Sequence, residues 1–111
     1  MSVQILLIKP GENPEVTEIE DALASYQNLV DGPIQMVRLT DDVALICNEE
    51  GKLRGLRHNR NFDLKHFKDY VVGNIIIVGI DDDSGEFVSL NASQTERFIN
   101  AFSDKRWIDI I

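Results

Sequence analysis

Short apolar runs bounded by turn residues recur along the chain, and they predict buried strands. Ile5-Leu6-Leu7-Ile8 and Ile75-Ile76-Ile77-Val78 are each four apolar residues long and lie close to glycine, proline or aspartate. Asp41-Asp42 separates two further apolar segments, which predicts a tight antiparallel pair. Gly51 is placed to take a positive φ in the next turn, at Glu49-Glu50-Gly51. Strands are expected at 3–9, 34–40, 43–48, 52–56, 74–80 and 86–90.

Helical periodicity appears in two other segments. Thr17-Glu18-Ile19-Glu20 has the form of a capping box, and apolar residues follow at three- and four-residue steps as far as Val30. Asp31-Gly32-Pro33 would end that helix. Ser93-Gln94-Thr95-Glu96 is a second capping pattern, before a buried stripe of Phe98, Ile99 and Phe102. A short helix is also expected at 63–70, with His66 on its polar face, and a loop at 57–61.

These elements predict one α+β domain spanning residues 1–111. We expect a mixed or antiparallel sheet of about five strands with two main helices, at about 17–30 and 93–102. The length of 111 residues suits a single core, and the 43% hydrophobic and 27% charged content is typical of globular proteins. The apolar tail, Trp107 to Ile111, would pack on the core or meet a partner.

Features that would place the chain in or across a membrane are missing from its sequence. Its longest apolar runs fall far short of the roughly 20 residues that span a bilayer. Met1-Ser2-Val3-Gln4 lacks the charged and apolar regions of a signal peptide. A single cysteine cannot form an internal disulfide. We therefore expect a cytoplasmic protein without membrane contact.

Candidate catalytic and metal-binding groups are weak. Asp81, Asp82, Asp83 and Glu86 could offer oxygen ligands, but their spacing is not that of a calcium loop and a solvated turn is the better interpretation. The adjacent carboxylates at 41–42 and 49–50 should diverge rather than share a proton. Cys47 could pair with His58 or His66, yet it falls within an apolar strand and should be a small buried hydrophobe. The sequence therefore predicts no catalytic residue, metal site or cofactor, and favours a non-enzymatic protein.

Charge is distributed unevenly along the chain. The formal net charge is −8. Residues 1–50 carry a balance of −8 and residues 71–111 one of −4, whereas residues 51–70 carry +4. The basic stretch could bind phosphate or carboxylates, and its candidate binding residues are Arg54, Arg57, His58, Asn59 and Arg60. Ordinary solvated surface remains an alternative for this stretch.

The acidic part of the chain suggests a second surface. Carboxylates are dense around the first expected helix, and a row of them can occupy a basic groove where phosphates would lie. The candidate residues of this acidic surface are Glu15, Glu18, Glu20 and Asp21. Acidic composition that serves only solubility is the alternative.

Motifs along nearly the whole chain resemble the family called domain of unknown function 3846. Its most distinctive part here is Cys47-Asn48-Glu49-Glu50-Gly51; other matching segments lie at 7–11, 31–32, 55–56, 59–60, 78–79 and 85–90. Arg57-His58 stands where the family pattern would have proline, which adds charge and removes rigidity. The resemblance implies an origin in phages and mobile elements, mainly of Gram-positive bacteria, and carries over no catalytic residues.

From these features we expect an accessory protein that binds a host or phage protein in the bacterial or phage-infected cytosol, through an acidic surface that mimics nucleic acid. A protein partner is favoured over nucleic acid or a nucleotide. The alternative is a small nucleotide- or phosphate-binding regulator that uses the basic loop 54–60.

Overall fold

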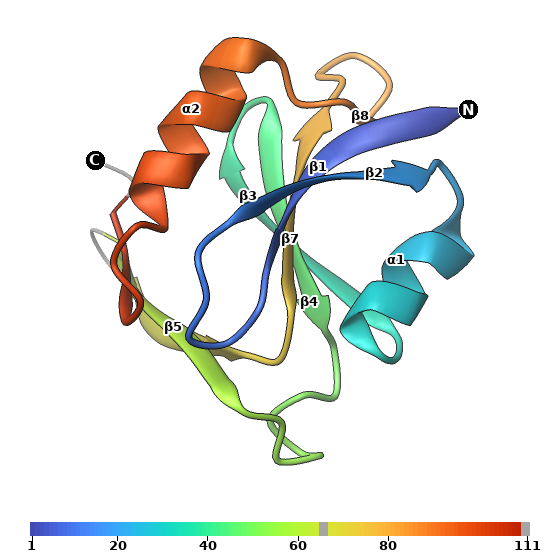
Figure 1. Ribbon diagram of the computed structural model, residues 1–111. Helices are drawn as coiled ribbons and strands as arrows, with labels where there is room; N and C mark the ends of the chain where they lie inside the picture. The colour runs from blue at the N-terminus through green and yellow to red at the C-terminus, as the bar shows by residue number, and fades with distance from the viewer. Residues whose placement is uncertain (65–66, 110–111) are drawn as a thin grey trace.

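The computed structural model, which describes residues 1–64 and 67–109, is built around one antiparallel sheet (Figure 1). Its three central strands are the apolar segments β1 (Ser2–Ile8), β7 (Ile75–Ile80) and β4 (Val43–Asn48). The strand order is β2-β1-β7-β4-β3, so that β2 (Glu15–Glu20) and β3 (Ile34–Thr40) form the edges. The short β8 (Phe87–Val88) pairs with β7.

A smaller sheet lies beside the first and has the order β6-β5-β9. β5 (His58–Leu64) and β6 (Phe67–Val72) form an antiparallel hairpin. β9 (Trp107–Ile108) joins β5 in parallel, so the C-terminal segment contributes a strand to this second sheet. The expected α+β fold is confirmed, although its strands form two sheets rather than one.

The central strands are buried on both faces, which explains their continuous apolar runs. Every residue of β4 and β7 is buried. One face packs against α1 (Leu23–Val30) through Tyr26 and Val30, and the opposite face packs against α2 (Ala92–Ala101) through Phe98. Figure 1 shows the two helices on opposite sides of the sheet. The second sheet closes the α2 side with the buried residues Phe62, Val71 and Ile108.

Sequence patterns identified the central strands and the last helix correctly. The strands expected at 3–9, 34–40, 43–48 and 74–80 are present, and that expected at 86–90 is reduced to β8. The cap of α2 is Asn91 and not Ser93 of the expected capping pattern, and the Asn91 side chain accepts a hydrogen bond from the Gln94 amide at 2.7 Å. The Gln94 side chain in turn accepts one from the Asn91 amide at 2.9 Å. Phe98 and Phe102 are fully buried, as their spacing predicted.

The expected start of the first helix is wrong. Residues 15–20 form edge strand β2, and the helix begins only at Leu23. The Thr17 hydroxyl donates to the Glu15 carbonyl at 3.2 Å instead of capping a helix. The segment satisfies its backbone by pairing along β1, from Ser2 opposite Glu20 to Leu7 opposite Glu15. Tertiary pairing has overridden the local capping signal.

The secondary structure expected for residues 52–70 is also wrong. Residues 52–56 form turns instead of a strand, and the expected loop at 57–61 and helix at 63–70 are the β5–β6 hairpin. The left-handed glycine of the turn region is Gly55, with φ 67°, and not Gly51. Gly51 is required for close packing, because a Cβ there would lie 2.8 Å from a methyl group of Val72. The His66 prediction lies outside the described residues.

No helix in the described part of the chain is both long enough and apolar enough to cross a membrane.

Tyr26 gives a test of the packing under α1. Its side chain is 2% exposed, and its hydroxyl has no hydrogen-bond partner among the described residues. Burial, together with the charge of Asp21, raises the pKa of Tyr26 from 10.0 to about 12. The folded state therefore holds the neutral phenol, and stability should fall as the pH rises from about 10 to 12, by roughly 2–3 kcal/mol.

Chemical denaturation at several pH values checks this prediction, with Tyr26→Phe as the matched variant. We expect Tyr26→Phe to be equal to the wild type or more stable by up to about 1 kcal/mol at pH 7, because it removes an unpartnered buried hydroxyl. Between about pH 10 and 12, the variant should also lose less stability than the wild type, because it has no Tyr26 hydroxyl to ionise. An identical alkaline loss in both proteins would contradict the assignment.

Candidate binding site

A β-bulge in β5 divides the predicted basic site into an inner and an outer part. His58 lies opposite Val72 and Arg60 lies opposite Val71, so Asn59 is the extra residue. A bulge locally changes the direction of side chains. Asn59 and Arg60 are 1% and 0% exposed, whereas Arg54, Arg57 and His58 are exposed. The structure therefore does not bring the five predicted residues together on one surface.

The inner pair connects the two sheets. Asn59 donates from Nδ2 to the carbonyl of Ile8 at 2.9 Å and to that of Gly73 at 2.7 Å. Its Oδ1 accepts a hydrogen bond from Arg60 Nη1 at 2.7 Å. This amide therefore connects β5 to the end of β1 and to the β6–β7 connection.

The Arg60 guanidinium continues the network. Its Nη2 donates to the carbonyls of Glu12, at 2.7 Å, and Phe102, at 3.1 Å. Burial lowers the pKa of Arg60 from its ordinary value, and the negative charge of Asp104 partly counteracts that effect. An arginine held in this way is a structural residue. Its predicted role in ligand binding stays a prediction, without support from its position.

The outer part of the predicted site consists of three exposed side chains. Arg54 forms an ion pair with Asp31, at 3.0 Å between Nη2 and Oδ2, and Nη1 donates to the Asp31 carbonyl. Arg57 lies beside Gly11 in the β1–β2 connection. A Cβ added at Gly11 would be 3.3 Å from Arg57 Nη2. The His58 ring stacks on Tyr70 with ring centroids 5.8 Å apart, and its Nε2 lies 2.8 Å from Asn61 Oδ1.

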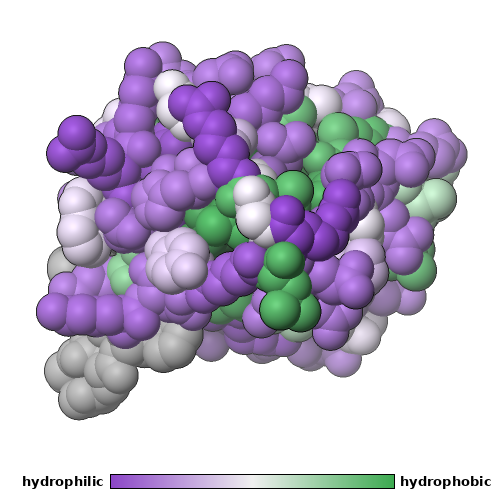
Figure 2. All heavy atoms as spheres, turned by 90° about the horizontal axis from the view of Figure 1, so that it is seen from below, coloured by the Kyte–Doolittle hydropathy of each residue, from purple (hydrophilic) through white to green (hydrophobic). Residues whose placement is uncertain are grey.

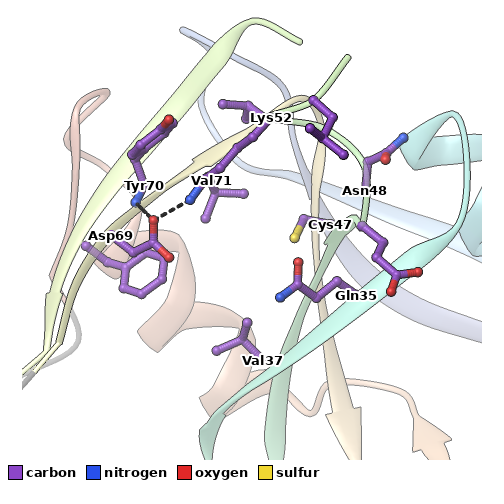
Figure 3. A pocket seen from close by; sticks show the side chains of 12 residues that line it. Gln35, Val37, Cys47, Asn48, Lys52, Asp69, Tyr70 and Val71 are labelled. Atoms are coloured by element: carbon purple, nitrogen blue, oxygen red, sulfur yellow. Dashed lines mark hydrogen bonds and ion pairs between the residues drawn. The ribbon is translucent and has the colours of Figure 1, made fainter. Parts of the chain in front are cut away.

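Beside these residues, a crevice of about 140 Å³ separates the two sheets. Val37 and Cys47 come from the first sheet, and Val71 and Asp69 come from β6 (Figure 3). In Figure 3, Val71 points from β6 toward Cys47, whereas Tyr70 points away. The sequence does not reveal this crevice, because its residues come from two different sheets and part of β6 was expected to be helical.

Lys52 and Asp69 form an ion pair at the rim of the crevice. The pKa of Asp69 is lowered mainly by the hydrogen bond from Lys52. The hydrogen bond from the Tyr70 amide lowers it further. Burial raises the pKa of Cys47, so its thiol is protonated at neutral pH. Cys47 is 8% exposed, as expected for a small buried hydrophobe.

The β4–β5 connection forms the lower end of the molecule in Figure 1, and Figure 2 views the protein from this side. The surface is largely hydrophilic, with hydrophobic atoms exposed near the centre of this view and toward its right side. Leu53, in the β4–β5 connection, has a side chain that is 93% exposed. Tyr70, in β6, is 44% exposed.

The predicted acidic residues all lie on the surface, but on a strand and a bend instead of a helix. Glu15, Glu18 and Glu20 belong to edge strand β2, and Asp21 follows it directly. Alternation in the strand places Glu18 and Glu20 on one face and Glu15 on the other. The Ser2 hydroxyl donates to Glu18 at 2.6 Å, from the neighbouring strand.

The carboxylates of the β7–β8 turn make local contacts. Asp81 Oδ1 accepts hydrogen bonds from the amides of Asp83 and Ser84, which closes the β7–β8 turn. Asp82 lies 3.7 Å from Arg38. Within residues 1–64 and 67–109, no three His, Cys, Asp or Glu side chains are arranged to hold a metal ion.

Comparison with known proteins gives one match. A family model described as a domain of unknown function (DUF3846) matches residues 1–103. No curated protein and no solved structure matches the chain.

The structural role of Arg60 can be tested by comparing its substitution with the same substitution of the exposed Arg57. Arg60→Met should lower the free energy of unfolding by about 3–5 kcal/mol, because it leaves buried carbonyls and the Asn59 amide oxygen without their donor. Arg57→Met should change it by less than about 0.5 kcal/mol. Urea denaturation of both variants measures the difference. Equal stabilities would show that Arg60 does not hold the sheets together.

Cys47 can be tested by its reactivity toward a thiol reagent. In the folded protein we expect the reaction with dithionitrobenzoate at pH 8 to be many-fold slower than in the unfolded chain, because the thiol is buried and its pKa is raised. The folded-state rate should increase steadily above pH 8. A rate equal to that of the unfolded chain would show that Cys47 is open to solvent.

Proposed function

The chain belongs to the domain of unknown function 3846 family, and from this premise we propose that it is a non-enzymatic accessory protein of a phage or mobile element. In this proposal it acts in the cytosol by binding a protein of the host or of the phage. The contact surface is the acidic edge, which we define as Glu15, Glu18, Glu20 and Asp21. The partner presents a basic surface of the kind that otherwise meets nucleic acid.

The observation that carries the proposal is the position of these carboxylates at an edge of the central sheet. All four are exposed, and three belong to the outermost strand. A charged edge strand disfavours addition of another strand. The edge is therefore suited to recognition by side-chain charge.

The arrangement of the edge also indicates how a partner would approach it. Residues two apart in a strand lie about 6.8 Å apart, so Glu18 and Glu20 form a short row on one face. Glu15 points to the other face, and Glu12 is exposed in the preceding connection. A partner that approaches the sheet edge-on can reach carboxylates from both faces, and opposite charge would steer the encounter.

The second candidate function is binding of a nucleotide or phosphate through residues 54–60. The burial of Asn59 and Arg60 weakens this hypothesis, and Arg54 is engaged with Asp31. The exposed His58, stacked on Tyr70, is the observation that keeps it open. Thermal unfolding with a panel of nucleotides tests it: a flat melting temperature would remove this candidate.

Affinity capture from host lysate tests the proposed function. The bait variant Glu15→Lys/Glu18→Lys/Glu20→Lys reverses the three strand carboxylates of the acidic edge. The control variant Asp82→Lys/Asp83→Lys/Glu86→Lys reverses an equal charge in the β7–β8 turn. We expect the wild type and the turn variant to retain the same basic partner. The edge variant should bind that partner at least about tenfold more weakly, because like charges then face each other.

Salt provides a second readout, since charge-dependent capture should weaken between about 0.15 M and 1 M ionic strength. Capture that is equal for both variants would exclude the acidic edge as the contact surface. Failure of the wild type to retain any specific protein would overturn the proposed function.

A further inference from the structure

The two edge strands of the central sheet differ in how they are protected against pairing with another strand. β2 carries Glu15, Glu18 and Glu20, and charged side chains of this kind oppose strand addition. β3 carries no carboxylate. Its one charged side chain, Arg38, turns back and donates to the Asp41 carbonyl at 2.7 Å. Its sequence therefore leaves β3 open to a further strand.

The pairing of β3 with β4 shows which backbone groups of β3 are free. The Glu49 amide donates to the Pro33 carbonyl at 2.8 Å, so these two residues form a hydrogen-bonded pair. Hydrogen-bonded and non-hydrogen-bonded pairs alternate along an antiparallel ladder. The amide and carbonyl groups of Ile34, Met36 and Arg38 therefore point away from β4. Within the part of the chain that the structure describes, these groups have no hydrogen-bond partner.

The crevice between the two sheets runs along one face of β3. Gln35 and Val37 line it together with Val71 of β6 (Figure 3). Ile34 and Met36 lie on the opposite face of the strand, because side chains alternate. A cavity of about 150 Å³ admits a benzene-sized group, so this crevice of about 140 Å³ can hold one aliphatic side chain. A strand added to β3 would direct every second side chain toward this face.

Exposed carboxylates lie at both ends of β3. Glu49 and Glu50 are next to its start, and Asp41 directly follows its end. Among the described residues, none of these three forms an ion pair. The cations of this region already have carboxylates beside them: Arg38 has Asp82, Lys52 has Asp69, Arg54 has Asp31 and Arg97 has Asp42. The free edge therefore lies between two sites of uncompensated negative charge.

These charges argue against a second copy of the chain as the occupant. Antiparallel pairing of two β3 strands would place Asp41 of one copy near Glu49 of the other. Parallel pairing would place each of these carboxylates near its own equivalent. Like charges would meet in both arrangements, and each copy has a net charge of −8. A segment with basic residues at its two ends would instead meet opposite charge.

From these observations we propose that β3 binds an extended segment of a partner protein by strand addition. Its backbone pairs with Ile34, Met36 and Arg38, and one long aliphatic side chain enters the crevice opposite Val37. Backbone pairing supplies affinity, and the pocket selects the side chain. The ends of β3 are about 20 Å apart, so basic residues about six positions apart meet the carboxylates. This edge lies opposite the acidic edge in the sheet, so the inference does not depend on the proposed function.

The probe for this site is the fluorescein-labelled peptide Lys-Arg-Val-Thr-Leu-Thr-Val-Arg-Lys. Its anisotropy should rise to saturation with a Kd below roughly 100 μM. The same peptide with proline in place of leucine keeps the charge but cannot continue a strand or fill the crevice. It should bind at least about tenfold more weakly. A peptide with glutamate in place of every lysine and arginine should also bind at least about tenfold more weakly, because like charges then meet.

Proline substitutions on the two edges give a matched pair of variants. Met36→Pro removes an outward amide from β3 and leaves the ladder with β4 intact. Val16→Pro does the same on β2, because the bond from the Asp21 amide to the Met1 carbonyl places the Val16 amide outward. Met36 and Val16 are 47% and 50% exposed. Met36→Pro should weaken peptide binding at least about tenfold, and Val16→Pro should change it by less than about twofold.

Charge reversal tests the same site without a change in the backbone of β3. Asp41→Lys/Glu49→Lys should weaken peptide binding at least about tenfold and reduce its salt dependence. Glu18→Lys/Glu20→Lys makes an equal change on the acidic edge and should leave peptide binding unchanged. Loss of partner capture by this second variant, with normal peptide binding, would separate the two surfaces. Urea denaturation confirms that each variant is folded.

Several results would overturn the inference. One is the absence of a saturable rise in anisotropy up to roughly 100 μM protein. Equal affinity for the leucine and proline peptides would show attraction by charge alone. Equal affinity for Met36→Pro and the wild type, or a loss of binding in Val16→Pro only, would remove β3 as the binding strand. A dimer of the wild type that Met36→Pro dissociates, measured by light scattering, would identify a second copy as the occupant instead.

Discussion

The buried Arg60 guanidinium is the interaction on which the arrangement of the two sheets depends. It reaches three separate parts of the chain: the adjacent Asn59, the β1–β2 connection at Glu12, and the C-terminal end of α2 at Phe102. Removing a cation from water costs free energy. Here the hydrogen bonds to the Glu12 and Phe102 carbonyls and to the Asn59 amide oxygen offset that cost. A guanidinium suits this position because its planar donors can serve several acceptors at fixed angles.

Asn59 is the partner that makes this burial possible. Its amide holds the Arg60 donor on one side and the carbonyls of Ile8 and Gly73 on the other. Both residues turn inward because of the bulge in β5. The same bulge leaves His58 on the outer surface, where it contacts Asn61 and Tyr70. One irregularity in one strand therefore separates the buried Asn59 and Arg60 from the exposed His58.

Some charges that are distant in sequence meet on the folded surface, because Arg54 pairs with Asp31 and Arg38 lies beside Asp82. The acidic edge belongs to β2, at one edge of the central sheet, whereas Lys52 and Arg54 lie in the connection between β4 and β5. The hydrophilic surface around the β4–β5 connection lies at one end of the molecule.

The sequence by itself determined the central strands and the last helix, because continuous apolar runs and the helical spacing of Phe98 and Phe102 are local signals. It also located the exposed carboxylates, since four charged side chains in seven residues cannot all be buried. Tertiary structure alone decided that residues 15–20 pair with β1 and that β5 pairs with β9 as well as with β6, because β1 and β9 lie far from their partner strands in sequence. It also decided which arginine is buried. The bulge at Asn59 turns Arg60 inward, whereas Arg57, which has the same side chain, is exposed.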